Sequence, residues 1–241
     1  MAIQSTIMAV TKVPASLRRE MLRLHSRYFC HVIQRRFMSD LAEKDWVIVL
    51  RDGKKLAGFS TIQVIRLRVC GRARIFLFSG DTIVDRDYWR NPALAGSFGH
   101  FMLRMLREHR GTPVYWFLIS KGYRTYRFLP VFFNRFYPTC LRQTPENYQR
   151  LLDSVARHKF GHAYDADSGL IRVAGKKDWL RSSFGQVPPS RQHDPHVAFF
   201  LESNPEHARG DELACVTPVS RANLNRFARR VIQHTSVMWE E

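Results

Sequence analysis

Residues 72–138 decide the fold of this chain and read RARIFLFSGDTIVDRDYWRNPALAGSFGHFMLRMLREHRGTPVYWFLISKGYRTYRFLPVFFNRFYP. Residues 73–84 are apolar and rich in β-formers, which predicts a strand. Residues 93–109 repeat apolar side chains at helical spacing, and residues 113–119 form a second apolar run bounded by turn signals. This order predicts a βαβ-like unit. The loop before the helix leads into a helix N-terminus, whose unpaired N–H groups favour an anion.

The composition is that of a basic globular protein. The chain has 241 residues, a formal net charge of +17 and 45% hydrophobic residues, which suffice for a full core and argue against disorder. The positive charge favours an acidic partner: nucleic acid, an acidic carrier protein, the phosphates of a nucleotide cofactor or an anionic membrane face. No apolar stretch reaches the roughly 18 residues of a membrane span, and no signal-peptide pattern begins the sequence. Four scattered cysteines without a CxxC pair favour a reduced, cytoplasmic protein.

Further strands and helices are predicted before this central stretch. Residues 4–12 predict a strand, and residues 17–38 predict an amphipathic helix or a pair of helices. Residues 46–50 and 55–68 predict a β-hairpin, because Asp52-Gly53 between them is a turn signal.

The C-terminal part of the sequence is less regular. Residues 122–136 predict an aromatic-rich helix that Pro130 kinks or splits. The remaining elements are predicted helices at 145–158 and 221–233 and predicted strands at 169–174, 196–201 and 211–216.

Several short segments carry a resemblance to a known family. They are Ser79–Asp85, Arg90–Gly99, Trp116–Ser120, Tyr123, Tyr126 and Phe136–Pro138. With the order of the predicted elements, they resemble the GCN5-related N-acetyltransferase (GNAT) superfamily. The resemblance implies an α/β (α+β) fold with a mixed, mostly antiparallel sheet flanked by helices. It covers residues 1–140 as an acyl-donor-binding core, and we expect residues 141–241 to complete the sheet and build the acceptor pocket.

The resemblance implies an N-acyltransferase that takes an acyl group from acyl-CoA or from the phosphopantetheine thioester of an acyl carrier protein. In this family the donor lies where the fourth and fifth strands part, and the following loop and helix hold its pyrophosphate. The positions that this implies for donor binding are the backbone of Ile83 and Val84, then Arg90, Gly96, Ser97, Phe98 and Gly99. The glycine pair comes later than in the family's Gln/Arg-x-x-Gly-x-Gly/Ala loop. Some relatives, the N-acyl amino acid synthases among them, use acyl carrier protein, and a basic surface suits that acidic donor.

The chemistry of acyl transfer suggests the catalytic candidates. The amine must lose a proton, the oxyanion must be stabilised, and the thiolate must leave. Asp81 either acts as the base or holds a cationic amine, and the alternative is a strand-end carboxylate that caps a turn or pairs with an arginine. The resemblance implies that Tyr126, with Tyr123 as its rival, protonates the thiolate, unless both belong to an aromatic core. Ser120 either bonds the leaving sulfur or begins the next helix.

Aromatic residues crowd the segment 115–137 beyond what an acetyl pocket needs. They line a tunnel for a longer, fatty acyl chain or form ordinary core. They are Tyr115, Trp116, Phe117, Phe128, Phe132, Phe133 and Phe136.

Other classes of site and function find less support. His158 and His162 have helical spacing, but Gly161 interrupts the helix and no HExxH motif is present, so we expect no metal. No GxSxG elbow or P-loop supports a hydrolase or an NTPase. The charge alone leaves a nucleic-acid or polyanion-binding module open, although no RNP, KH or zinc-finger motif supports it. A GNAT-shaped protein that has lost catalysis and binds a partner is the third hypothesis. The sequence leaves the acceptor open among small amines, amino acids and peptides.

Overall fold

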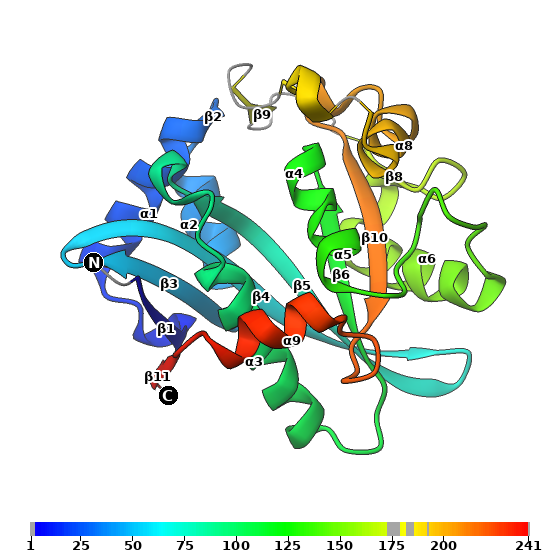
Figure 1. The fold of residues 1–241 in the computed structure, drawn as a ribbon, viewed down its shortest axis with the longest axis horizontal. Coiled ribbons are helices and arrows are strands. Elements are labelled where there is room, and N and C mark those ends of the chain that lie inside the picture. Colours follow the sequence, from blue (N-terminus) through cyan, green and yellow to red (C-terminus); the bar gives the residue numbers. More distant parts are fainter. Residues whose placement is uncertain (1–2, 173–178, 182–185, 192, 241) are drawn as a thin grey trace.

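The computed structural model describes residues 3–172, 179–181, 186–191 and 193–240 (Figure 1). Within these residues, nine strands form one mixed sheet in the order β11-β1-β3-β4-β5-β6-β10-β8-β7. Neighbouring strands are antiparallel except for the pairs β1–β11 and β5–β6. A mixed, mostly antiparallel sheet flanked by helices is the fold class that the sequence predicts, and the structure confirms it.

The strands of the large sheet come from both ends of the chain. They are β1 (Gln4–Ala9), β3 (Trp46–Asp52), β4 (Lys55–Val69), β5 (Arg72–Val84), β6 (Val114–Ser120), β7 (Tyr164–Asp165), β8 (Leu170–Ile171), β10 (Glu212–Pro218) and β11 (Met238–Glu240). A small separate sheet pairs β2 (Phe29–Cys30) with β9 (Trp179–Leu180). The described α-helices are α1 (Ala15–Tyr28), α2 (Gln34–Ala42), α3 (Ala93–Glu108), α4 (Tyr123–Tyr126), α5 (Phe128–Phe132), α6 (Glu146–Phe160), α8 (Pro195–Ser203) and α9 (Arg226–Gln233).

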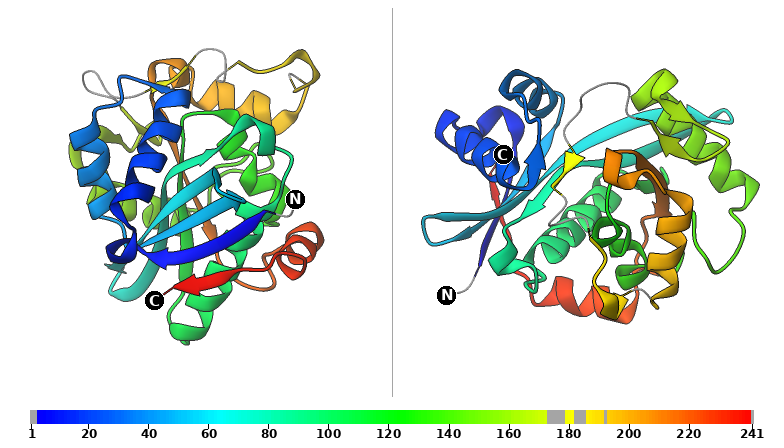
Figure 2. Two further views of the ribbon diagram at one scale, coloured as in Figure 1. Left: turned by 90° about the vertical axis from the view of Figure 1, so that its left-hand side faces the viewer. Right: turned by 90° about the horizontal axis from the view of Figure 1, so that it is seen from above.

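Helices cover both faces of the large sheet, which passes between them when the molecule is viewed from above (Figure 2). On one face, α3, α5, α8 and α9 enclose the main hydrophobic core. On the other face, α1 and α2 pack over β1, β3 and β4, while α6 packs over β4, β5, β6 and β10. Between these two groups of helices, part of the second face is left for a pocket.

β5 and β6 separate after Ser79 and Leu118, halfway along β5 and near the end of β6. They pair in parallel from Ile75–Val114 to Ser79–Leu118. Beyond that point β5 bulges and follows β4 to Val84, whereas β6 follows β10 to Ser120. Figure 1 shows the two halves of the sheet diverging here. The break lies in the middle of the sheet, where β5 stays paired with β4 on one side and β6 stays paired with β10 on the other.

The structure corrects several predicted elements. The apolar run 196–201 predicts a strand but lies in α8, because the Asp194 carboxylate accepts a hydrogen bond from His196 N (3.0 Å) and Pro195 occupies the first turn. The predicted strand 169–174 is reduced to β8, and its residues 173–174 lie outside the described part. No pattern in the sequence predicts the short strands β2, β9 and β11. None of the helices in the described ranges is long and apolar enough to cross a membrane.

Candidate active site

A cleft of about 470 Å³ opens on the α3 face of the sheet where β5 leaves β6. The end of β5, Thr82 to Val84, forms one side of it, and the segment from Lys121 to Phe132 forms the other. The loop before α3 and the first turn of that helix border the cleft with Arg90, Leu94 and Ala95. We call this space the donor-side cleft.

The backbone of β5 presents polar groups to the donor-side cleft. Asp85 N donates to Ala57 O at 2.8 Å, so by antiparallel alternation Ile83 bonds to β4 while Thr82 and Val84 direct their N–H and C=O groups away from it. Trp89 Nε1 donates to Val84 O on that side at 2.8 Å. In the described pairings β6 has already left, so an extended ligand can bond here as a strand would.

The mouth of the donor-side cleft is suited to an anion. The Asn91 side chain accepts a hydrogen bond from Ala93 N at 2.8 Å, and the next two residues of the 16-residue helix α3, Leu94 and Ala95, line the cleft. The arginines that line the cleft are Arg90, Arg124, Arg127 and Arg191. Arg124 lies over the Trp89 ring at 4.3 Å, while Arg127 is paired with Asp194 at 3.1 Å.

A second pocket, of about 220 Å³, lies on the opposite face between α1–α2 and α6. We call it the acceptor-side pocket. Its lining mixes both signs of charge: the carboxylates Asp40, Asp81 and Glu212 and the bases Arg36, Lys44, Lys121 and Lys159. Lys44 has a fully buried side chain and pairs with Asp40 at 2.7 Å. The carboxylates of the pocket have basic partners when no ligand is bound, and the same carboxylates can bind a charged amine when one enters.

Asp81 lies at the bulge of β5 and lines the acceptor-side pocket, with a side chain that is 26% exposed. His25 Nε2 is 3.5 Å from its carboxylate. Burial by itself would raise the pKa of Asp81, but the hydrogen bond and charge of His25, together with Lys44 and Lys121, hold that pKa below its ordinary value. A carboxylate that stays ionised is a weak base and a good partner for a cation, which favours the second of the two roles expected for Asp81.

The two spaces meet in the gap between the diverging strands. Thr82 on β5, Thr125 on α4 and Lys121 after β6 line both the donor-side cleft and the acceptor-side pocket. Lys121 Nζ lies 3.7 Å from Glu212 and 5.5 Å from the centre of the Phe29 ring. Groups bound from opposite faces of the sheet can therefore come into contact at this gap.

The structure separates the two candidate tyrosines. Tyr123 lines the donor-side cleft. Tyr126 lines none of the three described pockets; it is fully buried, and its hydroxyl donates to Pro138 O at 3.1 Å. Burial, with smaller contributions from Cys215 and Cys140, raises the pKa of Tyr126 far above its ordinary value. The geometry thus favours Tyr123 over Tyr126 as a group that could reach a ligand.

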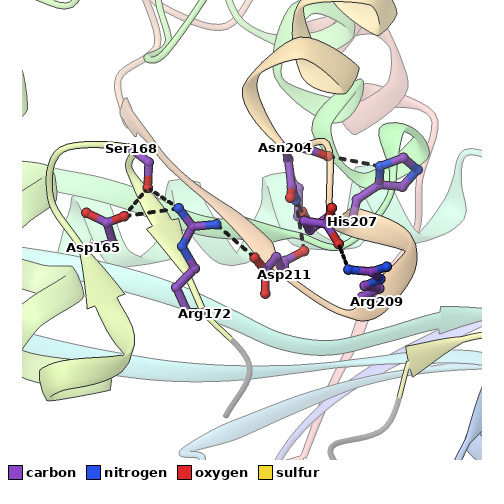
Figure 3. A network of polar contacts seen from close by, with 9 residues as sticks. Asp165, Ser168, Arg172, Asn204, His207, Arg209 and Asp211 are labelled. Atoms are coloured by element: carbon purple, nitrogen blue, oxygen red, sulfur yellow. Dashed lines mark hydrogen bonds and ion pairs between the residues drawn. The ribbon is translucent and has the colours of Figure 1, made fainter.

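Ser120, at the end of β6, is fully buried and lines none of the three pockets. Its carbonyl accepts a hydrogen bond from Asn204 Nδ2 at 3.4 Å, and the same amide donates to Asp211 O at 2.8 Å. Figure 3 shows this network continuing from Asp211 to Arg172 (3.2 Å). These bonds anchor the end of β6 to the start of β10, so that β6 is held away from β5.

The predicted donor-binding residues on α3 have different surroundings. Gly96 packs against Thr235, whose Oγ1 would lie 1.9 Å from a Cβ at this position, and Gly99 packs against Ile232. Ser97 Oγ lies 2.5 Å from Ser5 Oγ, beneath the helix. Phe98 packs on Trp116, with ring centres 4.9 Å apart. Arg90, Ile83 and Val84 do line the donor-side cleft. The glycine pair accordingly serves the contact of α3 with the C-terminal segment.

Sequence reasoning missed Thr82, Thr125, Lys121 and His25. Thr82 and Lys121 adjoin Asp81 and Ser120, which were singled out, so a wider window around the two strand ends would have included them. His25 is on α1, and only the fold brings it to Asp81. In the described ranges no three His, Cys, Asp or Glu side chains are grouped as metal ligands would be.

No protein-family model and no curated protein matches this chain. Several solved structures are similar to it. A conserved protein of unknown function from Enterococcus faecalis V583, described as a probable N-acyltransferase, is 10% identical with a TM-score of 0.43, covering 92% of this chain and 67% of its own. A GCN5-related N-acetyltransferase from Anabaena variabilis ATCC 29413 is 13% identical with a TM-score of 0.40, covering 53% and 31%.

The ribosomal-protein-S18-alanine N-acetyltransferase from Escherichia coli is 14% identical with a TM-score of 0.40, covering 91% of this chain and 97% of its own. The chain thus spans about two thirds of the E. faecalis protein and about a third of the A. variabilis protein. At these identities and TM-scores the similarity says nothing about the reaction, which has to be inferred from the site.

Proposed function

We propose that this protein is an N-acyltransferase that moves an acyl group from a phosphopantetheine thioester to an amine. The observation that carries the proposal is the gap between β5 and β6, where the donor-side cleft and the acceptor-side pocket meet at Thr82, Thr125 and Lys121. A thioester arm lying along β5 from one face would place its carbonyl where an amine can approach from the other. Holding the two reactants in this way supplies much of the acceleration of a two-substrate reaction.

The reaction follows from this arrangement. The acceptor's ammonium first loses a proton to solvent. The neutral amine then attacks the thioester carbonyl carbon, the C–N bond forms, and the carbonyl oxygen becomes an oxyanion. Lys121, at the gap, provides a positive charge close to that oxygen. When the C–S bond breaks, the thiolate takes a proton from Tyr123, the one of the two candidate tyrosines that lines the donor-side cleft. The proton that nitrogen loses after the attack passes to solvent in the acceptor-side pocket, and the products are an amide and a thiol.

The donor is either acyl-CoA or an acyl carrier protein. The start of α3 and the arginines of the cleft suit the phosphates of CoA. These phosphates lie at the end of the pantetheine arm, which CoA and the carrier protein have in common. The exposed Trp89 and Phe227, which also line the cleft, would suit the surface of a protein carrier, and the net charge of +17 would attract an acidic one.

The acceptor carries a cationic amine that Asp81 holds in the acceptor-side pocket. Because carboxylates and lysines line the pocket together, an acceptor with an anionic group beside its amine, such as an amino acid, is favoured over a simple polyamine.

Thiol release tests this function. Purified protein is incubated with acyl-CoA or acyl carrier protein and a panel of amines, and free thiol and amide mass are measured together. We expect thiol release that depends on the amine and yields the matching amide. Binding to polyanions that weakens steeply with salt, without any amide, would support the polyanion-binding alternative and contradict the proposal.

A further inference from the structure

A small apolar chamber opens off the donor-side cleft, beneath α3, α5 and α9. Its volume is about 50 Å³. Six residues border both spaces, so the chamber continues from the cleft: Thr82, Leu94, Ala95, Thr125, Phe128 and Phe132. Its inner wall includes Phe98, Met102, Trp116 and Ala228. The chamber begins where β5 leaves β6, at Ser79 and Leu118.

The lining of the chamber is almost entirely apolar. No charged side chain lines it. Its polar side chains are largely bonded to one another: Ser60 Oγ and Thr82 Oγ1 share a hydrogen bond of 2.7 Å, and Ser79 Oγ accepts from Trp116 Nε1 at 3.0 Å. Apolar cavities of this kind stay dry and bind hydrocarbon. The occupant is therefore an alkyl group and not a phosphate, an amide or a sugar.

We propose that this chamber receives the acyl tail of the donor and limits its length to a short aliphatic chain. The proposal rests on the acyl-transferase function and deepens it. A cavity of about 150 Å³ holds the six carbons of benzene, so a chamber of about 50 Å³ takes about two carbons. Donors of about three or four carbons then fit best. A long fatty chain, which the aromatic-rich segment suggested, would have to displace Phe98, Met102 or Trp116.

The aromatic residues of that segment divide between the chamber and the core. Trp116, Phe128, Phe132 and Phe133 line the chamber. Phe117 instead packs on Phe160 on the other face of the sheet, and the side chain of Phe136 packs on Tyr126. Only part of the segment is thus available to an acyl chain, in agreement with a short chamber.

Met102 gives the sharpest test. It lines the chamber from α3, whereas Met105, nearly one turn later on the same helix, is equally buried and does not. Met102→Ala removes Cγ, Sδ and Cε from the wall, so the preferred donor should lengthen by about two to three carbons. The ratio of kcat/KM for hexanoyl over acetyl donor should rise about tenfold or more. Met105→Ala, with a similar loss of buried volume, should change that ratio less than about twofold.

Ala228→Leu supplies the reverse change. Its side chain would fill the chamber from α9, so the ratio of kcat/KM for butyryl over acetyl donor should fall about tenfold. A series from acetyl to octanoyl is measured on CoA and on carrier protein, with circular dichroism melts for each variant. If Met102→Ala changes all chain lengths by one common factor, the chamber holds the pantetheine arm and the proposal is wrong. If the parent uses octanoyl donors as well as butyryl donors, the length limit is wrong. If no donor of any length releases thiol, the transferase function itself fails.

Discussion

Asp81 decides how the acceptor amine is held. It lines the acceptor-side pocket, and His25, Lys44 and Lys121 keep it ionised. Asp81→Asn should therefore raise the acceptor KM by about tenfold to a hundredfold, the range for a hydrogen bond to a charged group. The dissociation constant of the donor should change less than about twofold. The matched control is Asp87→Asn, an exposed carboxylate that pairs with Lys55 at 2.9 Å and lines neither space.

The pH dependence of stability reports on the same carboxylate. The pKa of Asp81 is lower in the folded protein than its ordinary value near 4, so its contribution is complete above that value and is lost as the pH falls through the folded pKa. The difference in unfolding free energy between parent and Asp81→Asn should shrink as the pH falls below about 4. A difference that shrinks already between pH 7 and pH 5 would mean that this pKa is raised.

The two tyrosines should behave differently on losing their hydroxyls. Tyr123→Phe should lower kcat about a hundredfold if its phenol protonates the thiolate. Tyr126→Phe should leave kcat within about twofold and lower stability by about 1 kcal/mol, because its hydroxyl bonds Pro138 O inside the core. The measurements are steady-state kinetics and urea unfolding of both variants. The reversed pattern would restore Tyr126 as the proton donor that the family resemblance implied.

At the residue scale, the sequence revealed what lies next to a strand end and missed what the fold brings there. Asp81 could be found because it is a carboxylate within the apolar stretch 73–84, two residues before Ile83-Val84. The choice between Tyr123 and Tyr126 could not be made from their spacing, because it depends on whether a short helix turns a side chain to the cleft or to the core. His25 could not be found at all, because its place beside Asp81 depends on the packing of α1 on the sheet.

At the scale of elements, the packing of α3 on the C-terminal segment positions the donor-side cleft. A Cβ at Gly96 would lie 1.9 Å from Thr235 Oγ1. Gly96→Ala should therefore destabilise the protein by about 1–3 kcal/mol, the usual cost of overpacking. That cost would lower Tm by about 2–4 °C per kcal/mol in a chain of this size. The measurement is thermal unfolding followed by circular dichroism.

A double-mutant cycle checks that the contact itself is responsible. Thr235→Gly removes the three atoms that crowd a Cβ at Gly96, so the double variant should recover more than about 1 kcal/mol relative to the sum of the single effects. Additive effects would show that Gly96 is needed for another reason, for example a bound anion at the start of α3.

The elements that the sequence predicted correctly have strong, regular patterns. The hairpin β3–β4, strand β5 and helix α3 follow from alternation, a turn glycine and helical spacing. The run 196–201 was mistaken because its apolar residues suit a strand, while the preceding Asp194-Pro195 begins a helix. β11 is only three residues long and forms the edge of the sheet by pairing with β1. A short-range sequence pattern cannot predict this pairing, because the two strands come from opposite ends of the chain.

At the scale of the whole molecule, the C-terminal part supplies β10 beside β6 and Glu212 in the acceptor-side pocket. A single sheet thus crosses the boundary at residue 140 that the resemblance suggested. The positive charge, which the sequence shows only as a total, includes a group of arginines at the donor-side cleft. The sequence could predict an acidic partner, whereas the face that receives it required the fold.

The central claim is that a thioester donor lies in the gap between β5 and β6, and a complex tests it most directly. The measurement is the crystal structure of the protein with a non-hydrolysable thioether analogue of butyryl-CoA. We predict the sulfur between Thr82 and Thr125, the pantetheine amides bonded to the backbone of β5, and the phosphates at the start of α3. An analogue bound elsewhere on the surface, or a gap that stays empty at saturating analogue, would contradict the account.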